Sequence, residues 1–260
     1  MLAGIDHLVI VVPDLGAAAA NYADLGFTVV PGGRHAVGTH NALIALQDGS
    51  YIELIAFYEP SPEHRWWAPL RQGGGLVDFC MQTDDLLGDT RGFREAGVAI
   101  DDPKPMTRRR PDGYLVRWVL SIPRGGHRAV APFLIQDETP RQERIPRETA
   151  HRNRVTGIAT LTVAVAEIDG VRGWYARVLG VPGQVIRRDE LEAAGLRFAV
   201  GPHAVDFLAP RGYGGPVAAW LRARGASPYG ATLNTAGGPV GPLEEGKSLG
   251  GRLALAPAAP

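Results

Sequence analysis

The segment Gly4-Ile-Asp-His-Leu-Val-Ile-Val-Val-Pro-Asp-Leu-Gly16 begins with an apolar run and ends in an acidic turn. It recurs, weakened, as Gly157-Ile-Ala-Thr-Leu-Thr-Val-Ala-Val-Ala-Glu-Ile-Asp169. The second copy keeps the apolar frame but has Thr160 where the first has His7. Such a repeat predicts copies of one structural unit, in which the histidine is a candidate site residue.

Both copies continue in the same order after this segment. An amphipathic stretch follows the acidic turn and ends at a glycine, Gly26 or Gly180, which predicts strand, helix and strand. In the first copy, two further predicted strands, 41–46 and 51–57, are joined through Asp48-Gly49, a strong hairpin signal. The repeated unit is therefore βαβββ.

A more diverged copy lies between these two. It begins at Gly75, and its acidic turn, Asp84-Asp85-Leu86, matches Pro13-Asp14-Leu15. We call the three copies units one, two and three in chain order. After Pro210 a fourth copy begins, but too few residues remain to complete it, and we call this part the remnant.

These repeats predict an α+β fold in which βαβββ units pair into curved, cup-forming mixed sheets. We expect one domain over residues 1–145, formed by units one and two, and another over 150–260, formed by unit three and the remnant. Three complete units leave unit three without a complete partner in the chain. An isologous homodimer, in which unit three pairs with its symmetry mate, would supply that partner.

Composition narrows the function classes. The 260 residues are 45% hydrophobic, and only the Gly-, Pro- and Ala-rich end after about residue 237 departs from the composition of a packed domain. The 27 basic residues balance the 27 acidic ones, so we expect no nucleic-acid or membrane partner and interpret Arg108-Arg109-Arg110 as a solvated turn.

Neither a membrane span nor a signal peptide is predicted. No apolar run approaches the roughly 20 residues that span a bilayer, and Asp6 and His7 interrupt the start where a signal peptide needs an apolar core. Cys80 is the only cysteine, so no internal disulfide can form. We expect a cytoplasmic protein.

Four segments carry a family resemblance: Gly4-Ile-Asp-His-Leu-Val, Leu25-Gly-Phe-Thr-Val, Gly38-Thr-His-Asn-Ala-Leu-Ile and Tyr51-Ile-Glu-Leu-Ile. Together they resemble the glyoxalase-like branch of the vicinal oxygen chelate superfamily, most closely over residues 1–57 and more weakly to about 210. The resemblance implies that paired units form a cup whose floor binds a divalent metal, such as Mn, Fe, Ni or Zn. Its ligands would come from the first and fourth strands of each unit.

Carried over to this sequence, the resemblance places His7 and Glu53 at the ligand positions of unit one. In unit two it sets Asp78 opposite His7, while Phe133 stands where a carboxylate is expected. The metal set would then be His7, Glu53 and Asp78, with Glu53 also moving a proton in catalysis. Asn41 and Phe133 would face the substrate.

Strand alternation provides an independent view of these side chains. His7 and Glu53 each stand in an apolar row, where an unpaired charge is costly, so both need partners. Asp78 shares its face with Cys80 and Gln82, which is typical either of a polar cavity lining or of a solvated sheet face. Cys80 is interpreted as a small buried hydrophobe.

Two further segments leave alternatives open. Arg65-Trp66-Trp67 either covers the cup mouth with a cation and aromatic rings or is a linker whose tryptophans pack on the sheet. In unit three, Asp206 aligns with Glu53 but has Thr160 in place of a histidine. That unit is predicted to be a structural or dimerising copy without a metal.

Three function classes follow. The first is a metal-dependent lyase, isomerase or dioxygenase that chelates the vicinal oxygens of a small substrate. The second is a metal-free protein that binds a small molecule, for example an antibiotic, which Phe133 favours. The third is a copy without any ligand. We place the enzyme slightly ahead of the binding protein.

Overall fold

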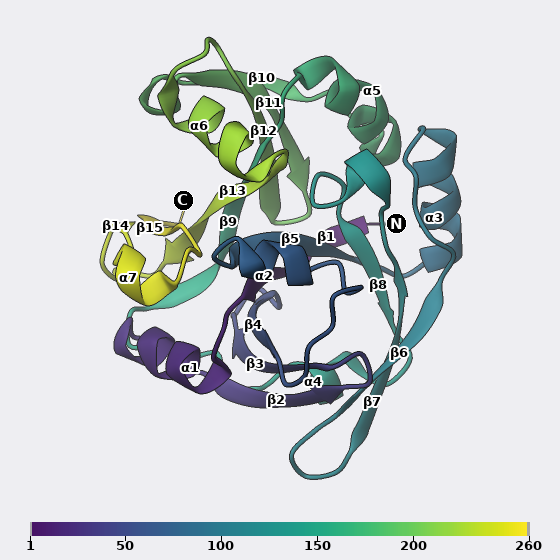
Figure 1. Ribbon diagram of the computed structural model, residues 1–260, viewed down its shortest axis with the longest axis vertical. Coiled ribbons are helices and arrows are strands. Elements are labelled where there is room, and N and C mark those ends of the chain that lie inside the picture. Colours follow the sequence, from purple (N-terminus) through teal and green to yellow (C-terminus); the bar gives the residue numbers. More distant parts are fainter. Residues whose placement is uncertain (1, 259–260) are drawn as a thin grey trace.

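Two packed sheets make up the computed structural model, which describes residues 2–258 (Figure 1). One sheet closes into a barrel of eight strands, and the other is an open sheet of seven strands. Units one and two supply the barrel, whereas unit three and the remnant supply the open sheet. The expected α+β fold of repeated βαβββ units is confirmed.

The barrel has the strand order β1-β4-β3-β2-β6-β7-β8-β5. Within each unit the first and fourth strands run parallel, while β1 and β5 join the two units in antiparallel fashion. Unit one comprises β1 (Leu2–Val11), α1 (Leu15–Asp24), β2 (Val30–His35), β3 (Thr39–Ala45) and β4 (Tyr51–Phe57). Unit two comprises β5 (Gly75–Thr83), α3 (Leu86–Glu95), β6 (Lys104–Arg109), β7 (Leu115–Ser121) and β8 (Phe133–Asp137).

Short helices lie in the connections around the barrel. The linker between its two units contains α2 (Trp67–Arg71), a 3₁₀ turn (Gly125–His127) precedes β8, and α4 (Arg141–Arg144) follows it. The two long helices start at equivalent aspartates, because Asp14 Oδ1 accepts a hydrogen bond from Ala17 N at 2.8 Å and Asp85 Oδ1 accepts one from Gly88 N at 2.9 Å. These caps fix where each first strand ends.

The caps and the strand pairing establish which residues are equivalent in the three units. His7, Asp78 and Thr160 each lie seven residues before the N-cap of the following helix, at Asp14, Asp85 or Glu167. His7 pairs with Tyr51, Cys80 with Phe133, and Thr160 with Ala204. Glu53, Phe133 and Asp206 therefore occupy one equivalent position on the fourth strands.

The open sheet has the order β10-β11-β12-β9-β13-β15-β14. Unit three comprises β9 (Val155–Ala164), α5 (Ile168–Leu179), β10 (Gln184–Arg188), β11 (Ala193–Val200) and β12 (His203–Pro210), with a 3₁₀ turn (Asp189–Leu191) before β11. The remnant comprises α6 (Gly215–Arg224), β13 (Ser227–Thr235), β14 (Gly241–Pro242), α7 (Glu245–Ser248) and β15 (Leu253–Pro257). Between residues 241 and 257 this Gly-, Pro- and Ala-rich segment is thus folded, despite its composition.

The remnant gives unit three a partner within the chain. Strand β13 pairs antiparallel with β9, as β5 pairs with β1, and β15 runs parallel to β13. Helix α6 packs on the sheet face that corresponds to the barrel interior, where Val217 joins Leu208 and Tyr229 in a small apolar cluster. The pairing that motivated a homodimer is therefore made internally, and the homodimer stays a prediction.

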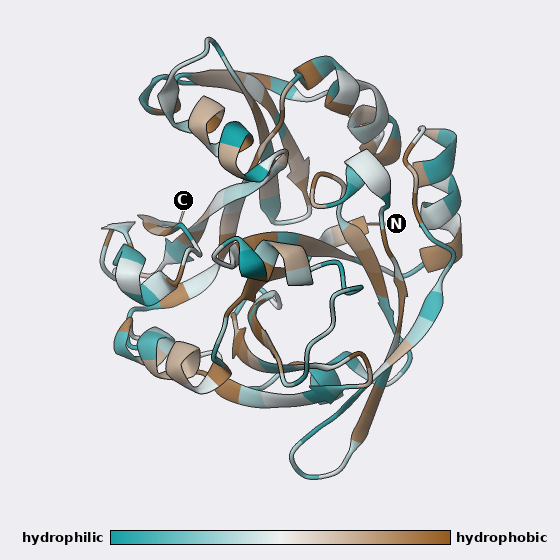
Figure 2. Ribbon diagram, viewed as in Figure 1, coloured by the Kyte–Doolittle hydropathy of each residue, from teal (hydrophilic) through white to brown (hydrophobic). Residues whose placement is uncertain are grey.

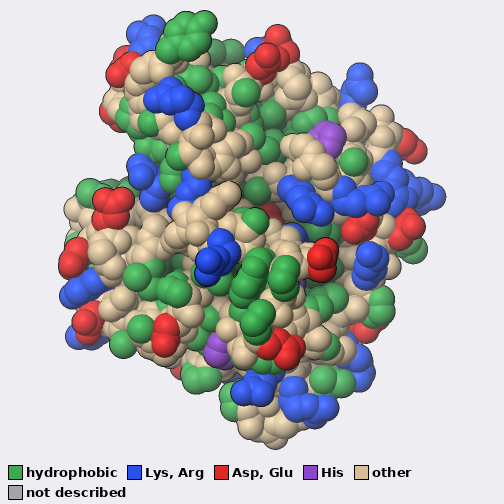
Figure 3. Space-filling model, in the orientation of Figure 1, with side chains coloured by type: hydrophobic (Ala, Val, Ile, Leu, Met, Phe, Trp, Pro, Cys, Tyr) green, Lys and Arg blue, Asp and Glu red, His purple; other side chains and the backbone are tan. Residues whose placement is uncertain are grey.

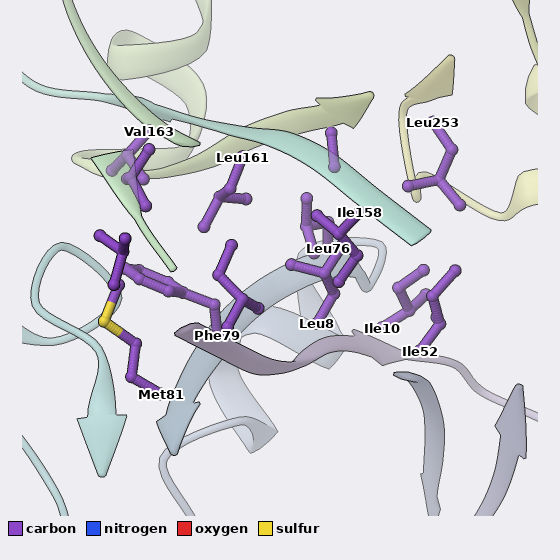
Figure 4. Packing of buried hydrophobic residues seen from close by; sticks show 14 of the residues in the cluster. Leu8, Ile10, Ile52, Leu76, Phe79, Met81, Ile158, Leu161, Val163 and Leu253 are labelled. Atoms are coloured by element: carbon purple, nitrogen blue, oxygen red, sulfur yellow. The ribbon is translucent and has the colours of Figure 1, made fainter. Parts of the chain in front are cut away.

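The two sheets share the largest apolar core. Outward-facing Leu8 and Ile10 of β1 and Phe79 and Met81 of β5 pack against the open sheet, on residues such as Leu161 (Figure 4). Figure 2 shows the corresponding apolar colouring along the central strands. Strand alternation leaves the inward-facing residues of β1 and β5 for the barrel interior. Among residues 2–258, no helix combines the length and the apolar character needed to span a bilayer.

Candidate functional site

The barrel encloses a cavity of about 310 Å³ at one end. Its apolar wall includes Ile55, Trp118 and Phe133, and its ionisable lining includes His7 and Glu53. A pocket of this size with a few convergent polar groups is suited to a small ligand. The cavity therefore contains both residues that the sequence placed at the ligand positions of unit one.

His7 is oriented by its neighbour Asp6. The Nδ1 atom of His7 lies 2.7 Å from Asp6 Oδ1. Burial acts to raise the pKa of Asp6, but the charge of Arg144 and the hydrogen bonds from His7 and Arg144 hold that pKa well below its usual range. Because an ionised Asp6 can only accept, His7 Nδ1 donates, and in the neutral ring Nε2 carries a lone pair.

That lone pair faces the carboxylate of Glu53. His7 Nε2 lies 3.5 Å from Glu53 Oε2, while Asn41 Nδ2 donates to Glu53 Oε1 at 2.5 Å. The side chain of Glu53 is only 7% exposed, and no lysine or arginine among residues 2–258 lies within ion-pair distance of it. Two acceptors thus meet inside the barrel, and a cation or a proton is needed between them.

His35 is a further imidazole beside the same carboxylate. Its Nε2 lies 4.0 Å from Glu53 Oε1, and its Nδ1 lies 2.9 Å from Thr39 Oγ1. Burial lowers the pKa of His35 to about 4, although the charge of Glu53 opposes this shift. His35 is therefore neutral at pH 7 and able to offer a lone pair.

Asp78 does not join His7 and Glu53. Its Oδ2 accepts a hydrogen bond from Trp66 Nε1 at 3.0 Å and lies 3.4 Å from Arg65 Nε. The Arg65 guanidinium also stacks on Phe133, with Cζ 4.3 Å from the ring centroid. Burial raises the pKa of Asp78, an effect that the charge of Arg65 opposes. In unit two, a guanidinium thus pairs with the first-strand carboxylate and stacks on the ring at the fourth-strand position.

In unit three, arginines neutralise Asp206, the carboxylate at the position equivalent to Glu53. Asp206 Oδ1 accepts a hydrogen bond from Arg197 Nε at 2.7 Å, and its Oδ2 accepts one from Arg188 Nη2 at 3.0 Å. Thr160 offers no imidazole here. Asp206 is instead paired with two arginines, in an arrangement typical of a structural ion pair. That unit three binds no metal stays a prediction.

One compact group of metal-type side chains occurs in the described part of the chain. Ligand atoms of Asp6, His7 and Cys80 lie within 4.8 Å of one another, and all three residues are buried. Asp6 already accepts hydrogen bonds from both Nη atoms of Arg144 at 2.9 Å, and burial raises the pKa of the Cys80 thiol well above its usual value. A protonated thiol and a fully engaged carboxylate are poor ligands.

Arg144 links this side of the site to the barrel wall. Its Nη1 donates to Tyr51 Oη at 2.9 Å and its Nε to Asp137 Oδ1 at 2.5 Å, in addition to its bonds with Asp6. The Tyr51 ring stacks on His7, with centroids 4.5 Å apart. The imidazole of His7 is thereby held by a hydrogen bond on its edge and a ring on its face.

Several expectations from sequence are modified by this geometry. The Asn41 amide supports Glu53 and is not part of the cavity lining, whereas Phe133 does line the cavity. Arg65 and Trp66 also line it, which favours the first of the two alternatives for that segment. Arg108 was wrongly assigned to a solvated turn: it is 3% exposed, because the segment is barrel strand β6.

Asp6, His35 and Arg144 were missed as site residues by sequence reasoning. His35 follows a Gly-Gly pair on the second strand, where the family pattern has no ligand, and Arg144 lies in an ordinary charged run. Alternation placed Asp6 on the strand face opposite to His7. No signal in the sequence would have joined these three residues.

Comparison with known proteins agrees with this architecture. A model of the glyoxalase-like domain matches residues 5–179. No curated protein matches the sequence.

Among solved structures, a hypothetical protein from Staphylococcus aureus is similar at a TM-score of 0.71 and 14% identity, over 97% of this chain and 98% of that one. A mutant 4-hydroxymandelate synthase from Streptomyces coelicolor has a TM-score of 0.61 at 16% identity, over 97% of this chain and 76% of that one. A fusion protein of a xylose isomerase-like TIM barrel and 4-hydroxyphenylpyruvate dioxygenase has a TM-score of 0.54 at 13% identity, over 90% of this chain and 36% of that one.

At these identities the solved structures establish the fold alone. The family model covers more than half of the chain and spans both barrel units, including His7 and Glu53. Together with the repeated βαβββ units, this match shows that the chain belongs to the glyoxalase-like domain family.

Proposed function

We propose that the barrel binds a divalent metal at His7 and Glu53 and acts on a small molecule bound beside it, as a metal-dependent enzyme. The supporting observation is the contrast among three carboxylates at the ligand positions of the units, Glu53 and Asp206 on fourth strands and Asp78 on a first strand. Asp78 and Asp206 both face arginines, whereas Glu53 faces imidazole nitrogens. Of these carboxylates, Glu53 alone is left for an external cation.

The donor set fits such an ion. Imidazole nitrogen and carboxylate oxygen together suit Zn, Fe, Mn or Ni, and two imidazoles with one carboxylate leave coordination positions open for substrate. His7 and Glu53 are the prearranged pair. His35 approaches the other oxygen of Glu53, so a change in its side-chain torsions would be needed for all three to meet on one ion.

The residues around the pair would each have a distinct task. Asp6 fixes the His7 tautomer, and Asn41 occupies Glu53 Oε1 and leaves Oε2 facing His7 Nε2 for the ion. Trp118 and Phe133 would exclude water from the bound small molecule. A divalent ion, when bound here, would polarise vicinal oxygens of the substrate and stabilise negative charge on them.

A metal-free binding protein is the second candidate, and unit two favours it. Phe133 replaces the fourth-strand carboxylate, and Arg65 already balances Asp78. Only half of the usual ligand set would then remain. In that case the cavity would sequester its ligand without changing it.

Metal content separates the two candidates. Protein incubated with Mn, Fe, Ni or Zn and then desalted should retain about one ion per chain by elemental analysis, and His7→Ala and Glu53→Ala should lose it. His40→Ala is the matched control, because His40 lies on β3 outside the cavity lining and should leave the metal bound. Absence of all four metals from the wild-type protein would refute the enzyme proposal and leave the binding protein.

A further inference from the structure

Two buried guanidinium nitrogens in the barrel have no hydrogen-bond partner among residues 2–258. They are Nη1 of Arg65 and Nε of Arg108, and both side chains line the cavity. Buried N–H groups are almost always satisfied, and leaving one unpaired costs about 1–3 kcal/mol, more when the group is charged. Two such donors at one cavity indicate that an oxygen-bearing ligand completes them.

The guanidinium of Arg65 is held by two aromatic rings and a carboxylate, one ring away from His7. Its Cζ lies 4.4 Å from the Trp66 ring centroid and 4.3 Å from that of Phe133, while Nε faces Asp78. The Phe133 ring in turn meets the edge of His7, with centroids 5.3 Å apart. Only one aromatic ring therefore separates Arg65 from His7.

Arg108 enters the cavity from strand β6. It is 3% exposed, and its Nη2 donates to the Arg144 carbonyl oxygen at 2.6 Å, which fixes the guanidinium. On the neighbouring strand β2, its register partner is His35. Burial lowers the pKa of both Arg108 and Arg65, and the charge of Glu53 opposes this effect in each. The two arginines thus line one cavity, Arg65 from the linker between the barrel units and Arg108 from β6.

The remaining lining indicates the rest of the ligand. Arginines outnumber acidic residues around the cavity: Arg65, Arg108, Arg124, Arg128 and Arg144 against Glu53, Glu63 and Asp101. In Figure 3, basic side chains run in a row across this face toward α3. Ile55, Trp118 and Leu120 add an apolar wall. Such a cavity attracts an anion and covers an apolar body.

We infer that the cavity takes a small organic carboxylate with an apolar, ring-sized body, whose carboxylate is bound by Arg65 and Arg108. The inference rests on the proposed function, since it names the class of small molecule for that site. Arginine suits this task, because its planar N–H groups match the two oxygens of a carboxylate. The neutral amide of the same acid would bind more weakly, because it offers one acceptor and no charge.

The test uses the full chain and matched probe pairs: phenylacetate with phenylacetamide, and benzoate with benzamide. Calorimetry should give at least about tenfold tighter binding for one or both acids than for the matching amide, the size of one charge-assisted hydrogen bond. Inorganic phosphate, which has charge but no apolar body, should bind more weakly than the preferred acid. Thermal shift provides a second readout, because a ligand of the native state raises the midpoint.

The variants must avoid leaving a buried charge unpaired. Arg65→Gln is therefore combined with Asp78→Asn, which removes both members of the ion pair. This double variant, and Arg108→Gln separately, should lower the affinity for the acid about tenfold or more and leave the amide unaffected. Arg91→Gln, an exposed change on α3 with the same loss of charge as Arg108→Gln, should alter neither affinity more than about twofold.

The outcomes distinguish the inference from the proposed function. If neither acid binds more tightly than its amide, or if the folded double variant keeps the wild-type preference for the acid, the carboxylate assignment is overturned even when the metal is present. If the preference depends on the arginines but no metal binds, the assignment stands and the enzyme proposal fails. Circular dichroism checks that each variant is folded before its affinities are compared.

Discussion

Asp6 and His7 are adjacent in sequence, yet their side chains are hydrogen-bonded to each other, with Asp6 Oδ1 2.7 Å from His7 Nδ1. Successive residues of a regular strand point to opposite faces. The β1–β5 register shifts between Ile5 and His7, and this local irregularity accompanies the contact. A buried carboxylate can therefore orient the imidazole from within the same strand.

Replacement of Asp6 should weaken metal binding at His7. Asp6→Asn retains the shape but removes the charge that selects the Nδ1–H tautomer, so the metal dissociation constant should rise about 10- to 100-fold. Asp137→Asn is the matched control, because it also removes a carboxylate from Arg144 but does not touch His7. Competition against a metal-binding dye measures both. Equal weakening in the two variants would show that the effect arises from Arg144 instead.

Substitution of Gly32 should disturb Glu53 through Asn41. A methyl group at Gly32 would overlap Asn41 Oδ1 and displace the amide that donates to Glu53 Oε1. We expect Gly32→Ala to lower the free energy of unfolding by about 1–3 kcal/mol. Gly126→Ala, where a methyl group meets nothing within 4 Å, should change it by less than about 0.5 kcal/mol. Urea denaturation of the two variants provides the comparison, and similar values would contradict the predicted clash.

Helix α3 should be stabilised by Gly92→Ala. Gly92 lies inside the helix, its φ angle is not positive, and an added methyl group would contact nothing within 4 Å. Alanine loses less backbone entropy on folding, so the free energy of unfolding should rise by about 0.5–1 kcal/mol. Thermal and urea unfolding test this increase. A destabilised variant would mean that α3 is packed more closely than described.

His64 should make stability fall with acid. Burial lowers the pKa of His64 from 6.5 to about 4 in the folded state. As the pH falls through 6.5, the unfolded chain binds a proton that the folded chain does not, so stability is fully present above 6.5 and declines toward pH 4. The slope is at most about 1.4 kcal/mol per pH unit for one histidine. His64→Gln should therefore show a shallower decline than wild type in urea titrations over this range, and parallel curves would contradict the assignment.

The fold could be predicted because the repeat is a property of whole segments. Apolar frames and helix caps recur in units one, two and three, so an element boundary that is ambiguous in one unit can be assigned from the others. The same reasoning located His7 and Glu53 at equivalent strand positions, and their side chains lie 3.5 Å apart. Whether they hold a metal stays a prediction.

The rest of the site depends on long-range contacts that the pattern does not encode. Arg65 meets Asp78 only because the linker between the barrel units folds back over the interior, and Arg144 meets Asp6 across 138 residues of sequence. Arg108 appeared solvated because three consecutive arginines usually are, but closure of the barrel buries one of them. The reach of a long side chain across a closed sheet cannot be read from periodicity.

The two joints between units one and two differ in strength. Strands β1 and β5 pair over most of their length and are backed from outside by the open sheet, whereas β2 and β6 meet only at Arg34 with Arg109 and at His35 with Arg108. The cavity consequently has a stiff wall that bears His7 and a compliant wall that bears His35 and Arg108. We expect amide hydrogen exchange to be faster at the β2–β6 joint than at β1–β5, and ligands of different bulk to be accommodated by movement of that joint.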